Sequence, residues 1–211
     1  GIKKIDCYIA THPHADHIGA IPGVLEQYTV SRFLMPYFSE LNTPTTKTYE
    51  KMLNAVLDED CDVIFPSVGE TVELGNLRLE ILAPAMETDD YNNMSIVVKA
   101  VYGKNTFLFM GDAQKASEKL ILENGQNVKA EVIKIGHHGS NSSSGADFIE
   151  AVSPLYAVIS CGKNNDYGHP HTETLESLSK YSKAVYRTDE DGAITIVLKN
   201  DEMRIYPFIG E

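Results

Sequence analysis

All seven histidines of the chain lie in three short segments, each at the end of a predicted strand. The segments are THPHADH (11–17), GHHGS (136–140) and YGHPH (167–171). Imidazole is the side chain that most often binds metal ions in proteins, and such sites tend to be built on loops at strand ends. The chain is therefore expected to fold so that the ends of several strands meet at one edge of a sheet.

Short apolar strands alternate with helical stretches along the whole sequence. The strands are predicted over 5–10, 31–36, 62–65, 71–74, 77–82, 95–102, 106–110, 131–135, 156–160, 184–186, 193–198 and 203–207. The helices are predicted over 19–28, 44–59, 114–123, 146–152 and 172–181. Hairpin turns are expected at Gly75-Asn76 and around Gly103-Lys104-Asn105. Hairpins mixed with strand–helix–strand units predict an α/β fold with two layers of sheet and helices outside.

The stretch 44–59 has the clearest helical pattern. Its apolar residues follow the i, i+3, i+4, i+7, i+8 spacing of a buried helix face: Tyr49, Met52, Leu53, Val56 and Leu57. Pro44 suits the first turn, where a missing N–H costs nothing. We therefore expect this helix to pack against a sheet through these side chains.

Composition limits the function classes. The 211 residues are 43% hydrophobic and 23% charged, which predicts one soluble globular domain, and no run of apolar residues is long enough to span a bilayer. The formal net charge of -12 disfavours a broad binding surface for nucleic acid or anionic lipid but leaves room for a local cationic site. Cys7, Cys61 and Cys161 are widely spaced, so neither a disulfide framework nor a thiolate zinc site is indicated. The chain opens at Gly1 without Met, and we interpret it as a fragment or a processed form.

The segment 11–17 carries the sharpest chemical signal. The i, i+2 spacing of His12 and His14 places two imidazoles on one side of an extended loop, while Asp16 and His17 can face a second position as the chain turns into a helix. Two divalent cations sharing one cleft explain this grouping. The alternative is a polar loop in which the histidines are accidental.

The apolar strand 106–110 is followed by a Gly-Asp pair, and its second residue, Asp112, is expected to place a carboxylate at the edge of the sheet. A lone Gly-Asp is more often a turn or a helix N-cap, and Asp112 could cap the helix that follows. Beside a histidine-rich loop, the favoured interpretation is a carboxylate that bridges two metal ions.

The two later histidine segments each offer a choice of ligand. Adjacent residues on an extended chain point in opposite directions, so we favour His138 as the ligand and His137 as a supporting residue. We favour His169, which follows Gly168 directly, over His171, which starts the next helix and could act as an outer hydrogen-bond donor or substrate contact.

The serines after the second histidine segment, Ser140, Ser142, Ser143 and Ser144, form either a flexible loop or a set of donors for phosphate oxygens.

Taken in order, HPHADH, MGD, GHHGS and YGHPH resemble the metallo-β-lactamase superfamily, and within it the branch of ComEC-like competence proteins and phosphorylcholine esterases. The resemblance covers Ile5 to Pro207 and implies an αββα sandwich with a binuclear, usually zinc, site at the sheet edge. It implies these metal ligands: His12, His14, Asp16, His17, Asp112, His138 and His169. Three residues of these motifs are expected to take part in catalysis: Asp16, Asp112 and His171.

Two departures from the family pattern stand out. The usual third histidine before the Gly-Asp strand is missing, and Asn92-Asn93-Met94-Ser95 stands in its place. In this branch the HHGS loop supplies the missing imidazole, which supports His138. The strands that normally precede the first histidine motif are also missing, so residues 1–211 are expected to form a single metallo-β-lactamase-like domain that lacks its N-terminal strands.

The predicted activity is metal-dependent hydrolysis of a phosphodiester by a metal-bridging hydroxide, with a small-molecule phosphodiester or single-stranded nucleic acid as substrate. Two divalent ions are expected, Zn first and Mn or Fe as alternatives. The loop before His169 holds Lys163, Asn164, Asn165 and Tyr167, which could contact phosphate, stack on a base or only be solvated. The alternatives are hydrolysis of a lactam, lactone or thioester, a non-catalytic metal-binding module, and redox chemistry on iron. The resemblance favours a secreted or membrane-associated extracytoplasmic location, and the cytoplasm stays an alternative.

Overall fold

The computed structural model describes residues 1–199 and 202–208, and within these residues seven strands form the larger of two packed sheets. The strands are β6 (Thr71–Leu74), β7 (Leu77–Ala83), β8 (Val97–Tyr102), β9 (Asn105–Phe109), β10 (Val132–Lys134), β11 (Tyr156–Ile159) and β12 (Ala184–Arg187). They lie side by side in the order β12-β11-β10-β9-β8-β7-β6. The pairs from β6 to β9 are antiparallel, and the pairs from β9 to β12 are parallel.

The smaller sheet comes from the N-terminal part of the chain. It is parallel and has the order β2 (Tyr8–Ile9), β4 (Arg32–Leu34) and β5 (Asp62–Ile64). Next to it, β1 (Lys4–Ile5) pairs with β3 (Thr29–Val30). One apolar cluster joins the two sheets face to face: Leu34, Val72, Leu79, Ile81, Ile96, Val98 and Ala100. The alternation of these side chains along β7 and β8 leaves their neighbours free to face the helices on the other side.

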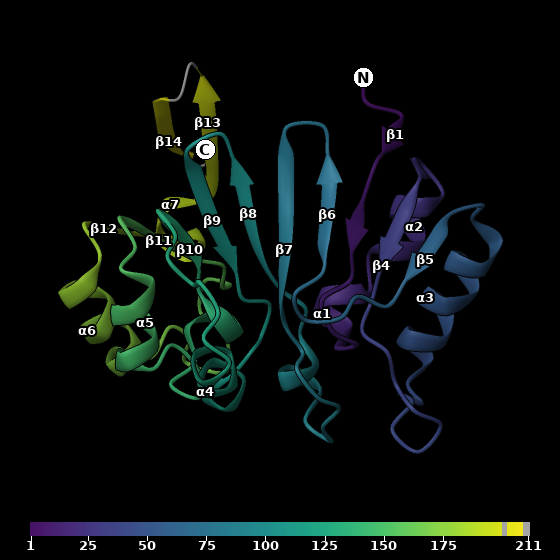
Figure 1. Ribbon diagram of the computed structural model, residues 1–211, viewed down its shortest axis with the longest axis horizontal. Helices are drawn as coiled ribbons and strands as arrows, with labels where there is room; N and C mark the ends of the chain where they lie inside the picture. The colour runs from purple at the N-terminus through teal and green to yellow at the C-terminus, as the bar shows by residue number, and fades with distance from the viewer. Residues whose placement is uncertain (200–201, 209–211) are drawn as a thin grey trace.

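The helices cover the two outer faces (Figure 1). Those given by the described residues are α1 (Ala15–Ile18), α2 (Ile21–Leu25), α3 (Lys47–Asp58), α4 (Lys115–Glu123), α5 (Ala146–Val152), α6 (Thr172–Tyr181) and α7 (Thr188–Asp191), with 3₁₀ turns η1 (Tyr91–Met94) and η2 (Gly136–Gly139). Helices α4, α5 and α6 share an apolar core with the larger sheet, and α2 and α3 share another with the smaller one. The predicted helix–sheet–sheet–helix sandwich is confirmed. No helix in the described ranges has the length and apolar character needed to cross a membrane.

Several predicted elements match closely. Helices α5 and α6 have the predicted bounds, and β6 and β7 form a hairpin at Gly75-Asn76 with Leu74 opposite Leu77. The last two strands, β13 (Ala193–Lys199) and β14 (Glu202–Phe208), pair antiparallel as a separate two-stranded sheet.

Other elements differ from the prediction. The helix predicted over 19–28 is limited to α2, and α1, β3 and α7 were not predicted. The strand predicted over 5–10 is two short strands, β1 and β2, which pair with different partners. Helix α3 starts at Lys47, because the hydroxyl of Thr46 accepts the N–H of Tyr49 as an N-cap, so Pro44 lies before the helix and not in its first turn. Leu57 is 79% exposed, so the buried stripe of α3 ends one turn earlier than its apolar spacing suggests.

The direction of the strands places the site. Because β9, β10 and β11 are parallel, their carboxyl ends meet at one edge of the larger sheet. Asp112 follows β9, His138 follows β10 and the loop containing His169 follows β11. The fold therefore brings three segments that are distant in sequence to one place.

Candidate metal centre

The first histidine loop leaves β2 and ends in α1. Backbone hydrogen bonds fix both of its sides, since the N–H of Ala10 donates to Leu34 and the carbonyl oxygen of Thr11 accepts from Ile96. His14 occupies the N-cap position of α1 with extended backbone angles, so Asp16 falls in the first helical turn. The loop thus changes from extended to helical within the motif, as its spacing predicts.

Asp112 is buried at the end of β9, with 2% of its surface exposed. Its N–H donates to the hydroxyl of Ser95 at 2.9 Å. The preceding Gly111 has φ +53°, and a Cβ there would lie 2.9 Å from Ser95 Oγ, so only glycine fits. The N-cap of α4 is Gln114, and the cap has no side-chain hydrogen bond. The alternative role of Asp112 as a helix cap is therefore wrong.

His137 and His138 lie in η2, and the expectation of an extended chain there is wrong. Both residues have left-handed backbone angles, with φ of 46° and 54°. This conformation is uncommon outside glycine and is found where surrounding structure enforces it. The turn separates the two rings: Nδ1 of His138 lies 2.7 Å from the carbonyl oxygen of Ser160, and Nδ1 of His137 lies 3.0 Å from Ser142 Oγ. A carbonyl oxygen can only accept, so His138 carries its proton on Nδ1 and keeps Nε2 free as a ligand atom.

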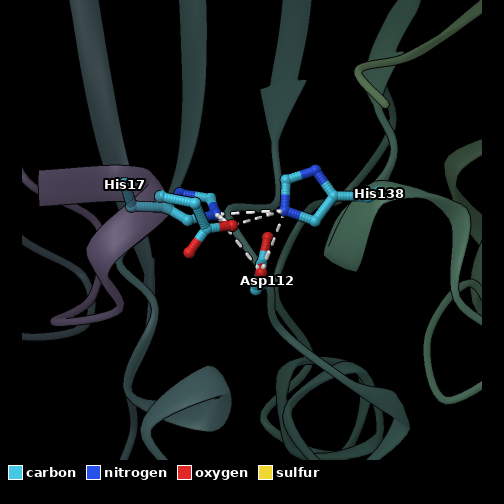
Figure 2. A group of neighbouring side chains, drawn as sticks. His17, Asp112 and His138 are labelled. Atoms are coloured by element: carbon cyan, nitrogen blue, oxygen red, sulfur yellow. Dashed lines mark hydrogen bonds and ion pairs between the residues drawn. The ribbon is translucent and has the colours of Figure 1, made fainter. Parts of the chain in front are cut away.

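Four side chains meet closely in the centre of this edge: Asp16, His17, Asp112 and His138. One ligand atom from each lies within 4.8 Å of the others. Figure 2 shows His17, Asp112 and His138 pointing toward one another, with Asp112 Oδ2 3.3 Å from Nε2 of His17 and 3.4 Å from Nε2 of His138. Two carboxylates and two imidazoles at such distances form a donor set that suits a divalent transition-metal ion.

The other predicted ligands surround this cluster. Nε2 of His12 lies 3.6 Å from Asp112 Oδ2, and the His14 ring lies 4.9 Å from the His12 ring. The His169 ring lies 6.4 Å from the ring of His138 and is nearly parallel to it. The structure therefore brings the seven predicted ligands into one region, four of them tightly. Their roles as ligands stay a prediction.

His171 has a different environment. Its Nδ1 accepts the backbone N–H of Asn141 at 2.9 Å, and its ring lies 4.9 Å from that of His169. In the neutral side chain the proton is then on Nε2, so His171 presents a hydrogen-bond donor beside the cluster.

Two buried polar atoms test whether the site fits a metal ion. Within the part of the chain that the structure describes, Nε2 of His12 and Oδ1 of Asp112 have no hydrogen-bond partner, although both residues are almost fully buried. Buried polar atoms are normally paired, and each unpaired one costs stability. Metal ions would satisfy both atoms, so the residues present fit the metals that the resemblance implies.

The protonation states of the site also suit metal binding. Burial, together with the nearby His17, lowers the pKa of His12 to about 3, and burial lowers the pKa of His169 as well. Burial alone would raise the pKa of Asp112, but its contacts with His138 and His17 lower it below its ordinary value. Asp112 is therefore a carboxylate and His12 a neutral imidazole at neutral pH, and these are protonation states that bind metals, whereas the contact with Asp112 raises the pKa of His138, so a metal ion bound there would replace a proton.

The serine loop is neither flexible nor a free set of donors, so both expectations for it need correction. Ser143 and Ser144 are buried. The hydroxyl of Ser143 donates to the carbonyl oxygen of Gly136 at 2.8 Å, and the hydroxyl of Ser142 contacts His137. The backbone N–H groups of residues 144 and 145 donate to the carboxylate of Glu118, which sequence reasoning missed. The loop therefore positions the histidines on either side of it.

A cavity of about 300 Å³ opens beside the cluster. Asp16 and His138 line one part of it, and Asn165, Tyr167 and His169 line another. Cys161 also borders it, but burial and the neighbouring Asp189 raise the pKa of its thiol to about 11, so it stays protonated and is a poor nucleophile.

Comparison with known proteins identifies the family. A model of the metallo-beta-lactamase superfamily matches residues 1–163, and the chain belongs to this superfamily. Members of the superfamily are mostly metal-dependent hydrolases, and the chain has their fold together with a candidate metal site.

The curated relatives indicate to which branch of the superfamily the chain is similar. ComE operon protein 3 of Bacillus subtilis is 35% identical over 98% of this chain and 26% of its own length. Competence protein ComA of Neisseria gonorrhoeae is 37% identical over 61% of this chain and 20% of its own length. The chain thus spans about a quarter of the length of the curated relatives it matches, and the resemblance to competence proteins is confirmed.

Among solved structures, CmlA of Streptomyces venezuelae, a diiron beta-hydroxylase, aligns with 87% of this chain and 44% of its own at a TM-score of 0.61. Sequence identity is 16%, so this similarity concerns the fold alone.

Proposed function

We propose that this chain is a binuclear metal-dependent hydrolase of phosphodiesters, acting on a small-molecule phosphodiester or on single-stranded nucleic acid. The observation that carries the proposal is the tight cluster of two carboxylates and two imidazoles beside the cavity of about 300 Å³. Two divalent ions, Zn in the first instance, would supply a hydroxide nucleophile at neutral pH and offset the charge that develops on phosphate oxygens. We also propose that residues 1–211 act as one such domain.

Each residue of the site is given a proposed role. We assign one ion to His12, His14 and His138, the other to Asp16, His17 and His169, and place Asp112 between them. Three imidazoles surround Oδ2 of Asp112 at 3.3 to 3.6 Å while Oδ1 is unpaired among the described residues, which supports a bridging role. The carboxylate of Asp16 is 63% exposed and can accept a hydrogen bond from an incoming water. His171 can donate from Nε2 to a phosphate oxygen.

Three observations favour phosphodiesters over lactams, lactones or thioesters. A large apolar cavity of about 690 Å³ exists, but it lies between β13 and the larger sheet and is lined by none of the histidines. The cavity at the cluster is bordered instead by three candidate metal ligands, Asp16, His138 and His169. Relatives named for competence and recombination belong to processes that handle DNA. The net charge of -12 opposes a polyanion at long range, and two bound cations would offset it where the phosphate binds.

The experiment is a side-by-side assay of the metal-loaded chain on bis-p-nitrophenyl phosphate, a phosphorylcholine ester, single-stranded DNA and a chromogenic cephalosporin. The Asp112→Asn variant serves as the inactive control. We expect hydrolysis of at least one phosphodiester that the control lacks. A protein that carries two metals, opens the cephalosporin and leaves every phosphodiester intact would show that the substrate class is wrong although the site is right.

A further inference from the structure

The loop between β11 and α6 presents an aromatic ring at the mouth of the site. Tyr167 is 77% exposed and lines the same cavity as Asp16 and His138. Single exposed aromatic residues are common on protein surfaces, so exposure alone carries little weight. The position matters here, because the ring borders the cavity in which a substrate phosphate would meet the metal ligands.

The ring is held in a defined orientation. His169 stacks on it, with the ring centroids 5.6 Å apart and the planes within 20° of each other. The ring of His169 is in turn within 17° of parallel to that of His138. His169 therefore lies near both the cluster residue His138 and the exposed ring of Tyr167, and its plane is close to parallel with each of them.

The loop that carries the ring is fixed by one side chain. Asn165 Nδ2 donates to the carbonyl oxygens of Gly162 and His169, at 2.9 and 2.6 Å, and its Oδ1 accepts the N–H of His169 at 2.9 Å. The N–H of Gly168 also donates to the carbonyl oxygen of Asn165. Because these contacts order the loop in the free protein, a ligand that stacks on Tyr167 loses little affinity to ordering it.

We propose that Tyr167 is a stacking platform for a nucleobase next to the scissile phosphodiester, which makes a single-stranded nucleic acid the substrate of the site. This inference rests on the proposed function. Every nucleotide carries a flat base close to a phosphate, and in a duplex that base is already covered by its neighbours. A net charge of -12 disfavours binding through the release of many counterions, so local contacts such as stacking gain in importance.

Binding measurements test the inference separately from catalysis. The probes are a short fluorescein-labelled oligothymidylate with phosphorothioate linkages, which resist cleavage, and a matched oligonucleotide without bases, both titrated by anisotropy. We expect the wild-type protein to prefer the base-bearing oligonucleotide, and Tyr167→Ala to bind it about 10- to 100-fold more weakly. Binding of the abasic oligonucleotide and the metal content should not change. Tyr167→Phe should behave as wild type, because the ring and not the hydroxyl makes the contact.

A matched control is Tyr102→Ala. Tyr102 is 44% exposed but lies at the β8–β9 turn, at the opposite end of β9 from Asp112, and should leave both affinities unchanged. Equal wild-type affinity for the two oligonucleotides would overturn the inference, as would an equal loss for both in Tyr167→Ala.

Cleavage of an ordinary oligonucleotide adds a second readout: Tyr167→Ala should raise KM and leave kcat near wild type. If the protein binds bases as expected but cleaves no phosphodiester, the proposed function fails while Tyr167 keeps its role. If it cleaves oligonucleotides and Tyr167→Ala changes neither KM nor base preference, the stacking inference fails while the proposed function stands.

Discussion

Replacing Glu118 by Gln tests whether a buried carboxylate beneath the serine loop costs stability at neutral pH. Glu118 is 3% exposed, and its two oxygens accept the backbone N–H groups of Ser144 and Gly145. Burial raises its pKa from 4.5 to about 7, although the two N–H donors and the nearby Lys115 act in the opposite direction. The folded state therefore favours the protonated carboxyl.

The expected magnitude follows from that difference. A rise from 4.5 to about 7 corresponds to about 3 kcal/mol, at about 1.4 kcal/mol per pKa unit. Since the pKa is higher in the folded than in the unfolded state, the contribution to stability is fully present below about pH 4.5 and is lost as the pH rises through about 7. Gln does not titrate and so lacks this dependence. Its NH2 group cannot accept the second backbone N–H group, and this loss lowers the stability of the variant equally at every pH.

The assay is urea unfolding of the wild type and Glu118→Gln, metal-free, at several pH values between about 4 and 8. Titration of the histidines affects both proteins alike and cancels in their difference. We expect the free energy of unfolding of the wild type to fall by about 3 kcal/mol relative to the variant over this range. A constant difference would refute the reasoning. A wild type that gains stability relative to the variant with rising pH would show that the N–H donors outweigh burial.

Three further predictions concern the metals. Elemental analysis of protein purified without chelator should give two transition-metal ions per chain, and one or none would contradict a binuclear centre. His138→Ala should lose metal together with activity, whereas His137→Ala should cost about 10- to 100-fold, and the reverse order would show that the two roles are exchanged. Asp112→Asn should stay folded, since Asp112 caps no helix, yet keep about one metal and lose several orders of magnitude in phosphodiester hydrolysis. A variant that keeps both metals and full turnover would remove Asp112 from the bridging position.

The sequence predicted the elements best where local signals agree. Helix α5 has the expected bounds because Gly145 precedes it and Pro154 follows shortly after it, and proline disfavours helical geometry in the residue before it. For α3 two start signals compete, and the hydroxyl cap of Thr46 determines the first turn, not Pro44. The exposed Leu57 shows a second limit, since apolar spacing gives the face of a helix but not the extent of the surface that covers it.

The place of the candidate site was predictable, while the facing of its side chains was not. Strand direction alone puts the residues after β9, β10 and β11 at one edge. The orientation of His137 and His138 depends instead on a left-handed turn next to Gly139, where a Cβ would lie 2.6 Å from Pro170 Cβ. That packing partner is distant in sequence, so a rule based on alternation along a strand could not have found it.

The hydrogen bonds that orient the site residues could not be predicted from the sequence either. A run of serines indicates which donors are present but not which hydrogen bonds they already make, and here the hydroxyls of Ser142 and Ser143 are engaged within the protein. The groups that orient the site come from elsewhere: the Ser95 hydroxyl for Asp112, and the Ser160 carbonyl for His138. Of these groups, only the burial of Glu118 could have been predicted, because it lies three residues before the buried Ile121 on the apolar face of α4. A carboxylate on that face must find partners, and in this chain it finds them in the loop that positions the histidines.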